Sequence, residues 1–328
     1  MIKSAFVGSD KKMFDWVYTE EQKARIAQLT ELVTPEYVSS EMLDSMDLSQ
    51  VEVIFSTWGM FRLSEAQLDR MPKLKAVFYA AGATDHFAVP LLSRDIQVSS
   101  AWRANGLPVA EFTMAQIILS MKNYFADTRA YNAPDRHHFV PYGPGNYGEK
   151  VVLIGNGAVS THLKRLLASC LTLEVEQIPT KEVTRERIAD SFRTGYVISN
   201  HLPNLPETEG LYNEELFLSM RPHATFINTG RGAQVDEPGM IRALQARPDL
   251  TALLDVTWPE PPVAGSPLYT MPNVHLSSHL AGSLNDETHR MAELAINEFL
   301  RYEKGLPLEH RVSWEDIRIV GKRSQPGA

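Results

Sequence analysis

The sequence predicts an α/β protein made of two doubly wound parallel-sheet domains, one inserted into the other. Short apolar runs alternate with helix-like segments through residues 1–100, and a second alternating series starts at residue 151. Alternation of this kind is typical of parallel sheets with helices on their faces. The length of 328 residues suits two domains that each have a core.

The composition is that of an ordinary globular protein, with 44% apolar and 22% charged residues. A net charge of −8 argues against a surface for nucleic acid or anionic membranes. Cys170 is the only cysteine, so an intrachain disulfide is excluded, which fits a reducing compartment. The chain shows no signal-peptide pattern and no apolar run of membrane-spanning length. We therefore expect a soluble, cytoplasmic protein.

The first series predicts strands at 2–7, 51–57, 74–80 and 97–100, and helices at 21–32, 64–70 and 86–92, with Ser64 as an N-cap. Ligands of such sheets bind beyond the carboxyl ends of the strands, where loops 56–62 and 81–85 lie. The small residues Ala81, Gly82 and Ala83 would let backbone amides face an anion such as a carboxylate. A plain loop is the alternative.

The two series are joined by a predicted long helix at 110–131 and a surface loop at 132–148. His137 and His138 in this loop raise the question of a metal. No acidic residue or cysteine lies at ligand spacing, so the pair predicts a solvated loop without a metal.

The second series opens on Val-Val-Leu-Ile-Gly-Asn-Gly-Ala-Val-Ser at 151–160. An apolar strand here runs into a tight turn at Gly155, and Gly157 lets the backbone approach a ligand. The amides that follow sit at a helix N-terminus, which favours a pyrophosphate. This pattern predicts a dinucleotide held by Gly155, Asn156, Gly157, Ala158 and Val159. The alternative is an ordinary strand-to-helix turn, since Ser160 replaces the third glycine.

The rest of the second series predicts strands at 173–178, 196–199, 224–228, 252–256 and 273–277. Helices are expected at 162–170, 184–192, 213–220 and 237–246, with a last long helix at 285–305 and a frayed tail at 322–328. We expect a dinucleotide-binding domain at 104–282 and a substrate domain from 1–103 and 283–328. The chain would cross twice between them, with the ligand cleft between the domains.

Three chemically active side chains follow the ends of predicted strands: Arg231, Glu260 and His279. A guanidinium holds a carboxylate and polarises a ketone, and an imidazolium gives its proton to the ketone oxygen as hydride arrives. A carboxylate beside the imidazole orients it. This set suits the reduction of a 2-keto acid. The alternative roles are a surface ion pair for Arg231, a solvated loop acid for Glu260 and a structural histidine for His279. For Asp255, at the end of a predicted strand, the alternative is to cap the next turn.

These segments resemble the D-isomer-specific 2-hydroxyacid dehydrogenase family. The resemblance is carried by 155–160, His-Leu-Pro-Asn-Leu-Pro-Glu-Thr at 201–208, 226–232 with Asp236 and Glu237, 254–261 and 279–282, and by 81–85 and 109–111. It implies an NAD(P)-dependent dehydrogenase, with a Rossmann domain inserted into a flavodoxin-like substrate domain. It also implies a homodimer formed through the nucleotide-binding domain.

The resemblance further implies roles for single residues. Arg231 would bind substrate, His279 would be the acid/base with Glu260 as its partner, and the amides of 81–83 would hold the carboxylate. Asp255 would contact the nicotinamide carboxamide. The other implied cofactor contacts are His201, Pro203, Thr208, Thr229 and Gly230.

The place where NAD-using enzymes carry a ribose-binding Asp falls at Gln177 or Ile178, and neither is acidic. Glu176 is close but would need a register shift. Thr180 and Lys181 follow, with Arg185 beyond them, and these side chains suit a 2′-phosphate. We therefore hypothesise NADP(H) as the preferred cofactor over NAD(H).

The substrate is less well defined. Four aromatic residues on predicted cleft loops suggest an apolar or planar substituent, with local packing as the alternative: Trp58, Phe61, Trp102 and Trp258. The charged side chains of Arg62 and Arg103 argue against an apolar substituent. Rival functions are a nucleotide-sensing corepressor, for which the chain lacks long disordered flanks, and a formate-type dehydrogenase, which would have glutamine at Glu260.

Overall fold

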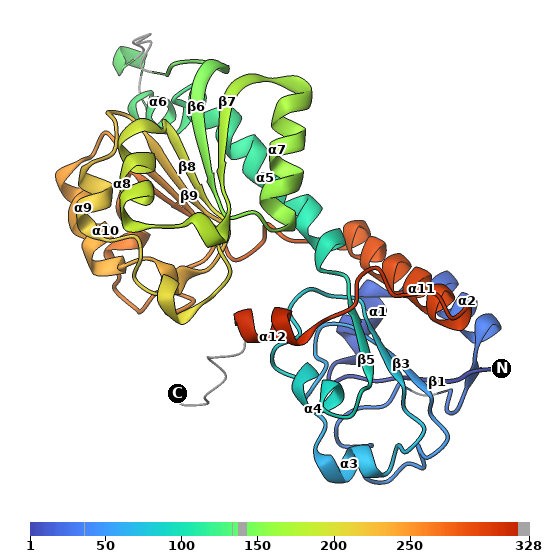
Figure 1. Ribbon diagram of the computed structural model, residues 1–328. Coiled ribbons are helices and arrows are strands. Elements are labelled where there is room, and N and C mark those ends of the chain that lie inside the picture. Colours follow the sequence, from blue (N-terminus) through green and yellow to red (C-terminus); the bar gives the residue numbers. More distant parts are fainter. Residues whose placement is uncertain (36, 133, 137–142, 321–328) are drawn as a thin grey trace. The chain divides into compact units, whose positions relative to one another are not determined.

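The computed structural model describes residues 1–35, 37–132, 134–136 and 143–320, and for 318–320 the backbone alone. The chain divides into two compact units (Figure 1). Unit 1 consists of Met1–Asn105 and Ser283–Ala328, and unit 2 of Gly106–Gly282. Both are α/β units with a wholly parallel main sheet, as predicted. None of the helices in the described part of the chain has the length and apolar character needed to span a bilayer.

Unit 1 has a five-stranded sheet in the order β2-β1-β3-β4-β5. Its strands are β1 (Lys3–Phe6), β2 (Glu31–Leu32), β3 (Val53–Ser56), β4 (Ala76–Tyr79) and β5 (Gln97–Ser100). Its helices are α1 (Lys11–Val17), α2 (Glu20–Leu29), α3 (Glu65–Asp69), α4 (Ala88–Leu92), α11 (His289–Glu303) and α12 (Trp314–Val320). Ser64 caps α3, as predicted, and forms a reciprocal capping box with Gln67.

Two elements at the N-terminal end of unit 1 differ from prediction. The expected helix at 21–32 ends at Leu29, because the Thr30 hydroxyl bonds back to the Ile26 carbonyl and also contacts the Ser4 hydroxyl on β1. The next two residues then form the edge strand β2. The sequence prediction also lacked α1, whose first turn is capped by the Asp10 carboxylate.

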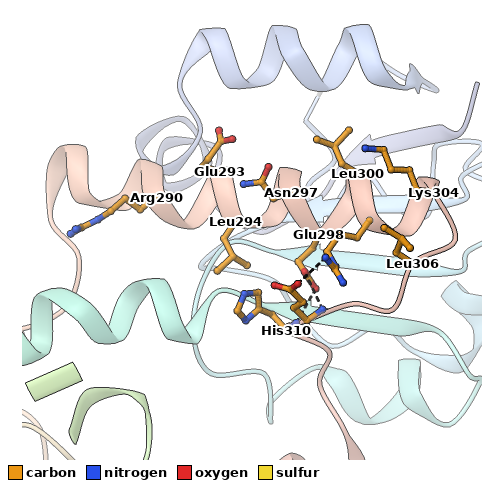
Figure 2. A pocket seen from close by; sticks show the side chains of 11 residues that line it. Arg290, Glu293, Leu294, Asn297, Glu298, Leu300, Lys304, Leu306 and His310 are labelled. Carbon is orange, nitrogen blue, oxygen red and sulfur yellow. Dashed lines mark hydrogen bonds and ion pairs between the residues drawn. The ribbon is translucent and has the colours of Figure 1, made fainter. Parts of the chain in front are cut away.

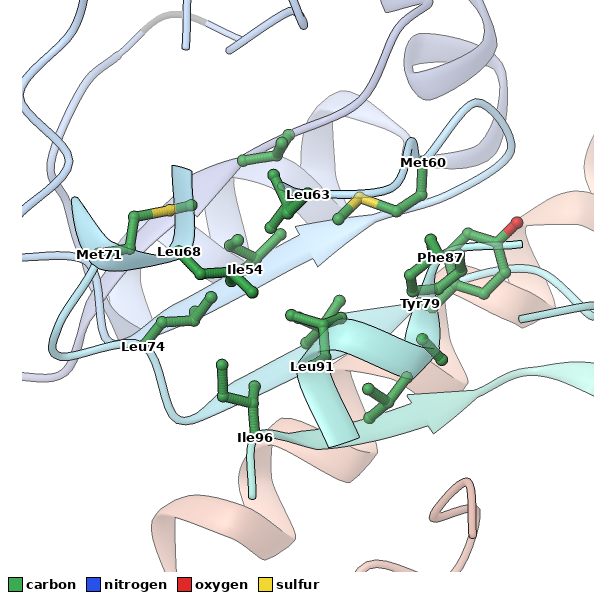
Figure 3. Close-up of a cluster of buried hydrophobic side chains, with 14 of the residues drawn as sticks. Ile54, Met60, Leu63, Leu68, Met71, Leu74, Tyr79, Phe87, Leu91 and Ile96 are labelled. Atoms are coloured by element: carbon green, nitrogen blue, oxygen red, sulfur yellow. The ribbon is translucent and has the colours of Figure 1, made fainter. Parts of the chain in front are cut away.

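The two faces of the unit 1 sheet carry separate cores, because successive strand residues point to opposite sides. Ile54 lies on one face with Leu63, Leu68 and Leu91 (Figure 3). The other face is aromatic and is covered by α11. The ring of Phe299 lies 5.4 Å from that of Phe55 and 5.6 Å from that of Phe78. The C-terminal segment therefore completes the core of the N-terminal sheet.

Unit 2 has a six-stranded sheet in the order β11-β10-β9-β8-β6-β7. Its strands are β6 (Tyr147–Ile154), β7 (Thr172–Ile178), β8 (Val197–Asn200), β9 (Thr225–Asn228), β10 (Thr251–Leu254) and β11 (Val274–Leu276). Its helices are α5 (Trp102–Met121, which starts in unit 1), α6 (Tyr124–Ala130), α7 (Ala158–Cys170), α8 (Arg185–Thr194), α9 (Glu214–Leu218) and α10 (Glu237–Ala246).

The predicted helix at 110–131 starts too late and misses a break. It is two helices, because Asn123 adopts a left-handed conformation with φ +55° that ends α5 and starts α6. At its start α5 continues through Gly106 and Pro108. Gly106 packs closely on α7, since a Cβ there would lie 3.2 Å from the Cβ of Ala158.

Smaller differences occur elsewhere. The surface loop predicted at 132–148 is shorter, because β6 already begins at Tyr147. The last helix begins with a 3₁₀ turn at Asn285–Thr288 before α11. His137 and His138, and the tail at 322–328, lie outside the described residues.

The strands of unit 2 end together in one row. Ile154 on β6 pairs with Ile178 on β7 and with Asn200 on β8, and Asn200 pairs with Asn228 on β9. The row continues through Leu254 and Leu276, the last residues of β10 and β11. Every loop that follows this row therefore starts at the same edge of the sheet, which we call the carboxyl edge.

Candidate active site

The turn after β6 contains two glycines with different constraints. Gly155 has φ +115°, and a Cβ there would lie 2.5 Å from the carbonyl oxygen of His201. No other residue fits this position without moving the backbone. A Cβ at Gly157 would meet nothing within 4 Å. Nothing in the described part of the chain therefore requires glycine at this second position, and the turn leaves room for a ligand to approach the backbone closely.

The start of α7 offers free donors at this turn. Within the described residues, the amides of Gly157, Ala158 and Val159 donate no hydrogen bond. Such a helix N-terminus favours an anion. Ser160, at the third position of the motif, is buried; its hydroxyl donates to the Gly157 carbonyl and accepts from the Gln177 side chain. The serine thus ties the helix start to β7 and leaves the turn intact.

The end of β7 has no acidic side chain at the carboxyl edge. Glu176 is in register with Val152 and pairs with Lys150 at 2.9 Å and with Arg187 at 3.6 Å. Beyond the strand, the amide and hydroxyl of Thr180 both donate to the side-chain oxygen of Asn156. The turn after β7 is therefore fastened to the glycine turn. Lys181 is exposed beside it, and among the described residues neither Lys181 nor Arg185 has an ion pair.

The loop after β8 contains three residues predicted to bind cofactor. Burial lowers the pKa of His201 to about 3, so its ring is neutral at neutral pH. One ring nitrogen contacts the Ser199 hydroxyl at 2.9 Å, and Nδ1 has no partner among the described residues. The Thr208 hydroxyl lies 2.8 Å from the Leu205 carbonyl and 3.3 Å from that of Pro203. Thr208 thus closes the loop from inside, and Nδ1 of His201 is a buried nitrogen that no described residue satisfies.

Glu260 and His279 come together at the neighbouring ends of β10 and β11. His279 Nδ1 lies 2.7 Å from Glu260 Oε1, and their side chains remain 52% and 40% exposed. Nε2 of His279 makes no hydrogen bond within the described residues. The imidazole is therefore oriented at one nitrogen and accessible at the other.

Asp255 holds the backbone on which His279 sits. His279 has φ +56°, a strained conformation for this residue type. Its amide donates to the Asp255 carbonyl, and the buried Asp255 carboxylate accepts from the amides of Leu280 and Ala281 and from the Ser277 hydroxyl. Asp255 therefore caps this turn, which is the structural role given as its alternative from the sequence. The hydrogen bond from Ser277 was not predicted from the sequence.

The loop after β9 carries Arg231 and lies directly on the loop that leads to Glu260. A Cβ at Gly232 would be 2.0 Å from the Thr257 carbonyl carbon, so the two backbones are in contact. Arg231 is exposed, and one of its guanidinium nitrogens donates to the Gly230 carbonyl at 2.7 Å. Thr229, also on this loop, contacts the Thr113 hydroxyl of α5 at 3.4 Å. Arg231, Glu260 and His279 thus project from three adjacent strand ends.

In unit 1, the loop after β4 offers backbone donors. The amides of Ala81, Gly82 and Ala83 donate no hydrogen bond within the described residues, while the carbonyls of Ala81 and Gly82 accept from the Ser100 hydroxyl. After the neighbouring strand β3, Trp58 stacks on Trp16 with ring centroids 5.7 Å apart and packs against both cores of the unit.

The other aromatic residues singled out from the sequence differ in burial. Phe61 packs against the core of unit 1, whereas Trp102 and Trp258 are 40% and 64% exposed. Local packing thus accounts for Phe61 and for part of Trp58. Within the described residues no group of histidine, cysteine and acidic side chains is arranged to hold a metal ion.

A hollow of about 630 Å³ lies in unit 1 between α11 and the segment that follows it, and none of the predicted site residues lines it (Figure 2). The buried carboxylate of Glu298 accepts there from the amides of Glu309 and His310. Glu298 therefore fastens the C-terminal segment to α11, which is a structural role.

The parallel-sheet fold and the open glycine turn fit an oxidoreductase that uses a nicotinamide dinucleotide. Comparison with known proteins agrees. Residues 114–281 match the family model described as D-isomer specific 2-hydroxyacid dehydrogenase, NAD binding domain. A glyoxylate reductase of Thermofilum pendens is 30% identical over 255 residues, which cover 73% of this chain and 74% of that protein.

The fold is also similar to that of solved structures. D-mandelate dehydrogenase of Rhodotorula graminis superposes with a TM-score of 0.77 at 18% identity, covering 95% of this chain and 97% of that one. The chain belongs to the D-isomer specific 2-hydroxyacid dehydrogenase family. It is an NAD(P)-dependent oxidoreductase that interconverts 2-keto and D-2-hydroxy acids.

The two glycines of the β6 turn give a matched test of cofactor binding. We expect Gly155→Ala to lower the free energy of unfolding by about 2 kcal/mol or more, because the new Cβ meets the His201 carbonyl. Gly157→Ala should leave the melting temperature within about 2 °C of wild type yet weaken NADPH binding by roughly tenfold or more. Thermal unfolding and NADPH fluorescence titration measure the two effects. Unchanged NADPH affinity in Gly157→Ala would contradict the assignment of the turn.

Proposed function

We propose that His279 is the acid/base of 2-keto acid reduction, with Glu260 as its partner and Arg231 as the substrate-binding cation. The supporting observation is the 2.7 Å contact between His279 Nδ1 and Glu260, which leaves Nε2 accessible. A cofactor site fits the same edge of the sheet, because the β6 turn has open space at Gly157 and free amides at the start of α7. When bound there, NAD(P)H supplies the hydride.

The protein groups act on the substrate in a defined order. Arg231 holds the carboxylate or the keto oxygen and polarises the carbonyl. His279, oriented by Glu260, gives the proton on Nε2 to that oxygen, and in the reverse direction it removes the hydroxyl proton. The net change is 2-keto acid, NAD(P)H and a proton to D-2-hydroxy acid and NAD(P)⁺. Considered by themselves, the free amides of Ala81, Gly82 and Ala83 on unit 1 suit a carboxylate ligand.

Removal of the catalytic groups tests these roles. We expect His279→Ala to lower kcat by on the order of 10²-fold or more, since the proton then comes from water. Arg231→Ala should raise KM for the keto acid as well as lower kcat. The assay follows NADPH oxidation with glyoxylate, hydroxypyruvate, phenylpyruvate and branched 2-keto acids. Exposed Arg193 on α8 provides the control substitution Arg193→Ala, with wild-type kinetics expected. Unchanged turnover in both site variants would reject the assignment.

We propose that NADPH is preferred over NADH as the cofactor. The β7 end has no acid to bind ribose hydroxyls, and Lys181 and Arg185 follow it without ion pairs among the described residues. We therefore expect kcat/KM to be at least about tenfold higher with NADPH than with NADH. Lys181→Ala should reduce the NADPH value and leave the NADH value unchanged. Lys164→Ala, on the exposed side of α7, is the control. A tenfold higher kcat/KM with NADH than with NADPH in the wild type would overturn the proposed cofactor preference.

We also propose that the protein is a cytoplasmic homodimer formed through unit 2. Residues 112–121 of α5 contain no charged side chain, yet Phe112, Met114 and Ile118 are only half-buried and Ala115 is exposed. A mainly apolar helix without charges on any face is normally covered on most of its surface. A second copy of α5 would provide that cover.

Sedimentation equilibrium tests the dimer. The wild type should sediment at twice the mass of one chain. Ala115→Glu should yield monomers, because it places a charge in the apolar face. Ala168→Glu makes the same change on the exposed side of α7 and should remain dimeric. A monomeric wild type at micromolar concentration would refute the proposal.

A further inference from the structure

A cluster of buried side-chain amides lies in the middle of the carboxyl edge of unit 2. Asn200 and Asn228, the last residues of β8 and β9, face one another in register, and Gln234 lies three residues beyond Arg231. All three have 0% exposure. A buried amide is unfavourable unless its hydrogen-bonding groups are satisfied. The cluster therefore requires an explanation in terms of its partners.

Asn200 is at the centre of the cluster. Its amide nitrogen donates to Asn228 Oδ1 at 2.9 Å and to Gln234 Oε1 at 2.6 Å. Its oxygen accepts from the Leu202 amide at 3.1 Å and from the Tyr212 hydroxyl at 2.8 Å. The hydrogen-bonding capacity of this side chain is thus fully used.

The other two amides extend from Asn200 to the two loops. Gln234 Nε2 donates to the Leu202 carbonyl at 3.2 Å and the Pro203 carbonyl at 2.7 Å, on the loop after β8. Asn228 accepts from the Gly230 amide and donates to the Arg231 carbonyl, both at 3.1 Å, on the loop after β9.

The Arg231 loop also rests on the cluster sterically. A Cβ at Gly230 would lie 2.8 Å from Asn200 Nδ2, so no space remains between this loop and β8. On its other side the loop touches Thr257 through Gly232. Movement of the Arg231 backbone in either direction therefore requires hydrogen bonds of the cluster to break or backbone contacts to shift.

We propose that Asn200 and Gln234 are positioning residues that fix the Arg231 loop relative to the loop after β8. This inference rests on the proposed role of Arg231. Apolar side chains of similar size would fill these sites without the desolvation of several polar groups. A fully satisfied polar network specifies one arrangement, whereas hydrophobic packing tolerates several. The cluster thus sets where the guanidinium stands relative to the cofactor loop.

Gln234→Met tests the proposal, because methionine keeps the length of the side chain and removes its hydrogen bonds. We expect kcat/KM for the best 2-keto acid of the panel to fall about tenfold or more, with a rise in KM for the keto acid. The matched control is Asn273→Leu, which removes another buried amide of unit 2, bonded to the Leu244 carbonyl. The control should lose a similar amount of thermal stability and keep wild-type kinetics below its melting temperature.

A double-mutant cycle with Arg231→Lys separates an effect on the position of Arg231 from a general loss of structure. If Gln234 acts through Arg231, Gln234→Met causes less than a threefold further loss in the Arg231→Lys background. Multiplicative losses, or wild-type kinetics in Gln234→Met, would overturn the inference. Unchanged kinetics in Arg231→Lys and Arg231→Ala would instead reject the proposed function itself.

A second, smaller substitution tests the inference if the Gln234→Met protein does not fold. Tyr212→Phe removes one hydroxyl from Asn200 Oδ1 and leaves the rest of the cluster in place. We expect a two- to threefold loss of kcat/KM, again absent in the Arg231→Lys background. Wild-type kinetics in a folded Tyr212→Phe protein would contradict the inference.

Discussion

The parallel register of the six strands in unit 2 is the constraint on which the site depends. Each strand stops at the same row, from Ile178 through Asn200 to Leu276. Parallel hydrogen bonding fixes the relative height of the strands, and a shift of one residue would turn every side chain to the opposite face. The loops that carry the glycine turn, Arg231 and the Glu260–His279 pair therefore start at one edge regardless of their distance in the chain.

Close backbone contacts hold these loops in place beyond that row. The glycine turn lies against the carbonyl of His201, and Gly232 lies against Thr257. Buried polar side chains then fasten each loop to its neighbour: Asp255 holds the turn of His279, and Asn200 links the two loops on either side of it. Rigid elements and satisfied hydrogen bonds of this kind are what a catalytic geometry requires.

The candidate site can be predicted from the sequence where its signals are local. Gly155 and Gly157 follow an apolar run directly, and His279 follows a short strand, so the rule that ligands bind at strand ends points to them as candidates. The break at Asn123 could not be seen, because the apolar pattern continues through it and the left-handed residue decides the outcome. The partners of Asn200 lie up to 34 residues away, and a single asparagine at a strand end does not identify them.

The two-segment construction of unit 1 has a consequence for synthesis on the ribosome. Its sheet is built from the first 100 residues, but the rings of Phe55 and Phe78 are covered by Phe299 of α11. Unit 2 is one continuous stretch, so all of its strands have been translated while the aromatic face of unit 1 still awaits its covering helix. The nascent chain therefore carries an open apolar surface throughout the translation of unit 2, a period in which chaperones have a defined target.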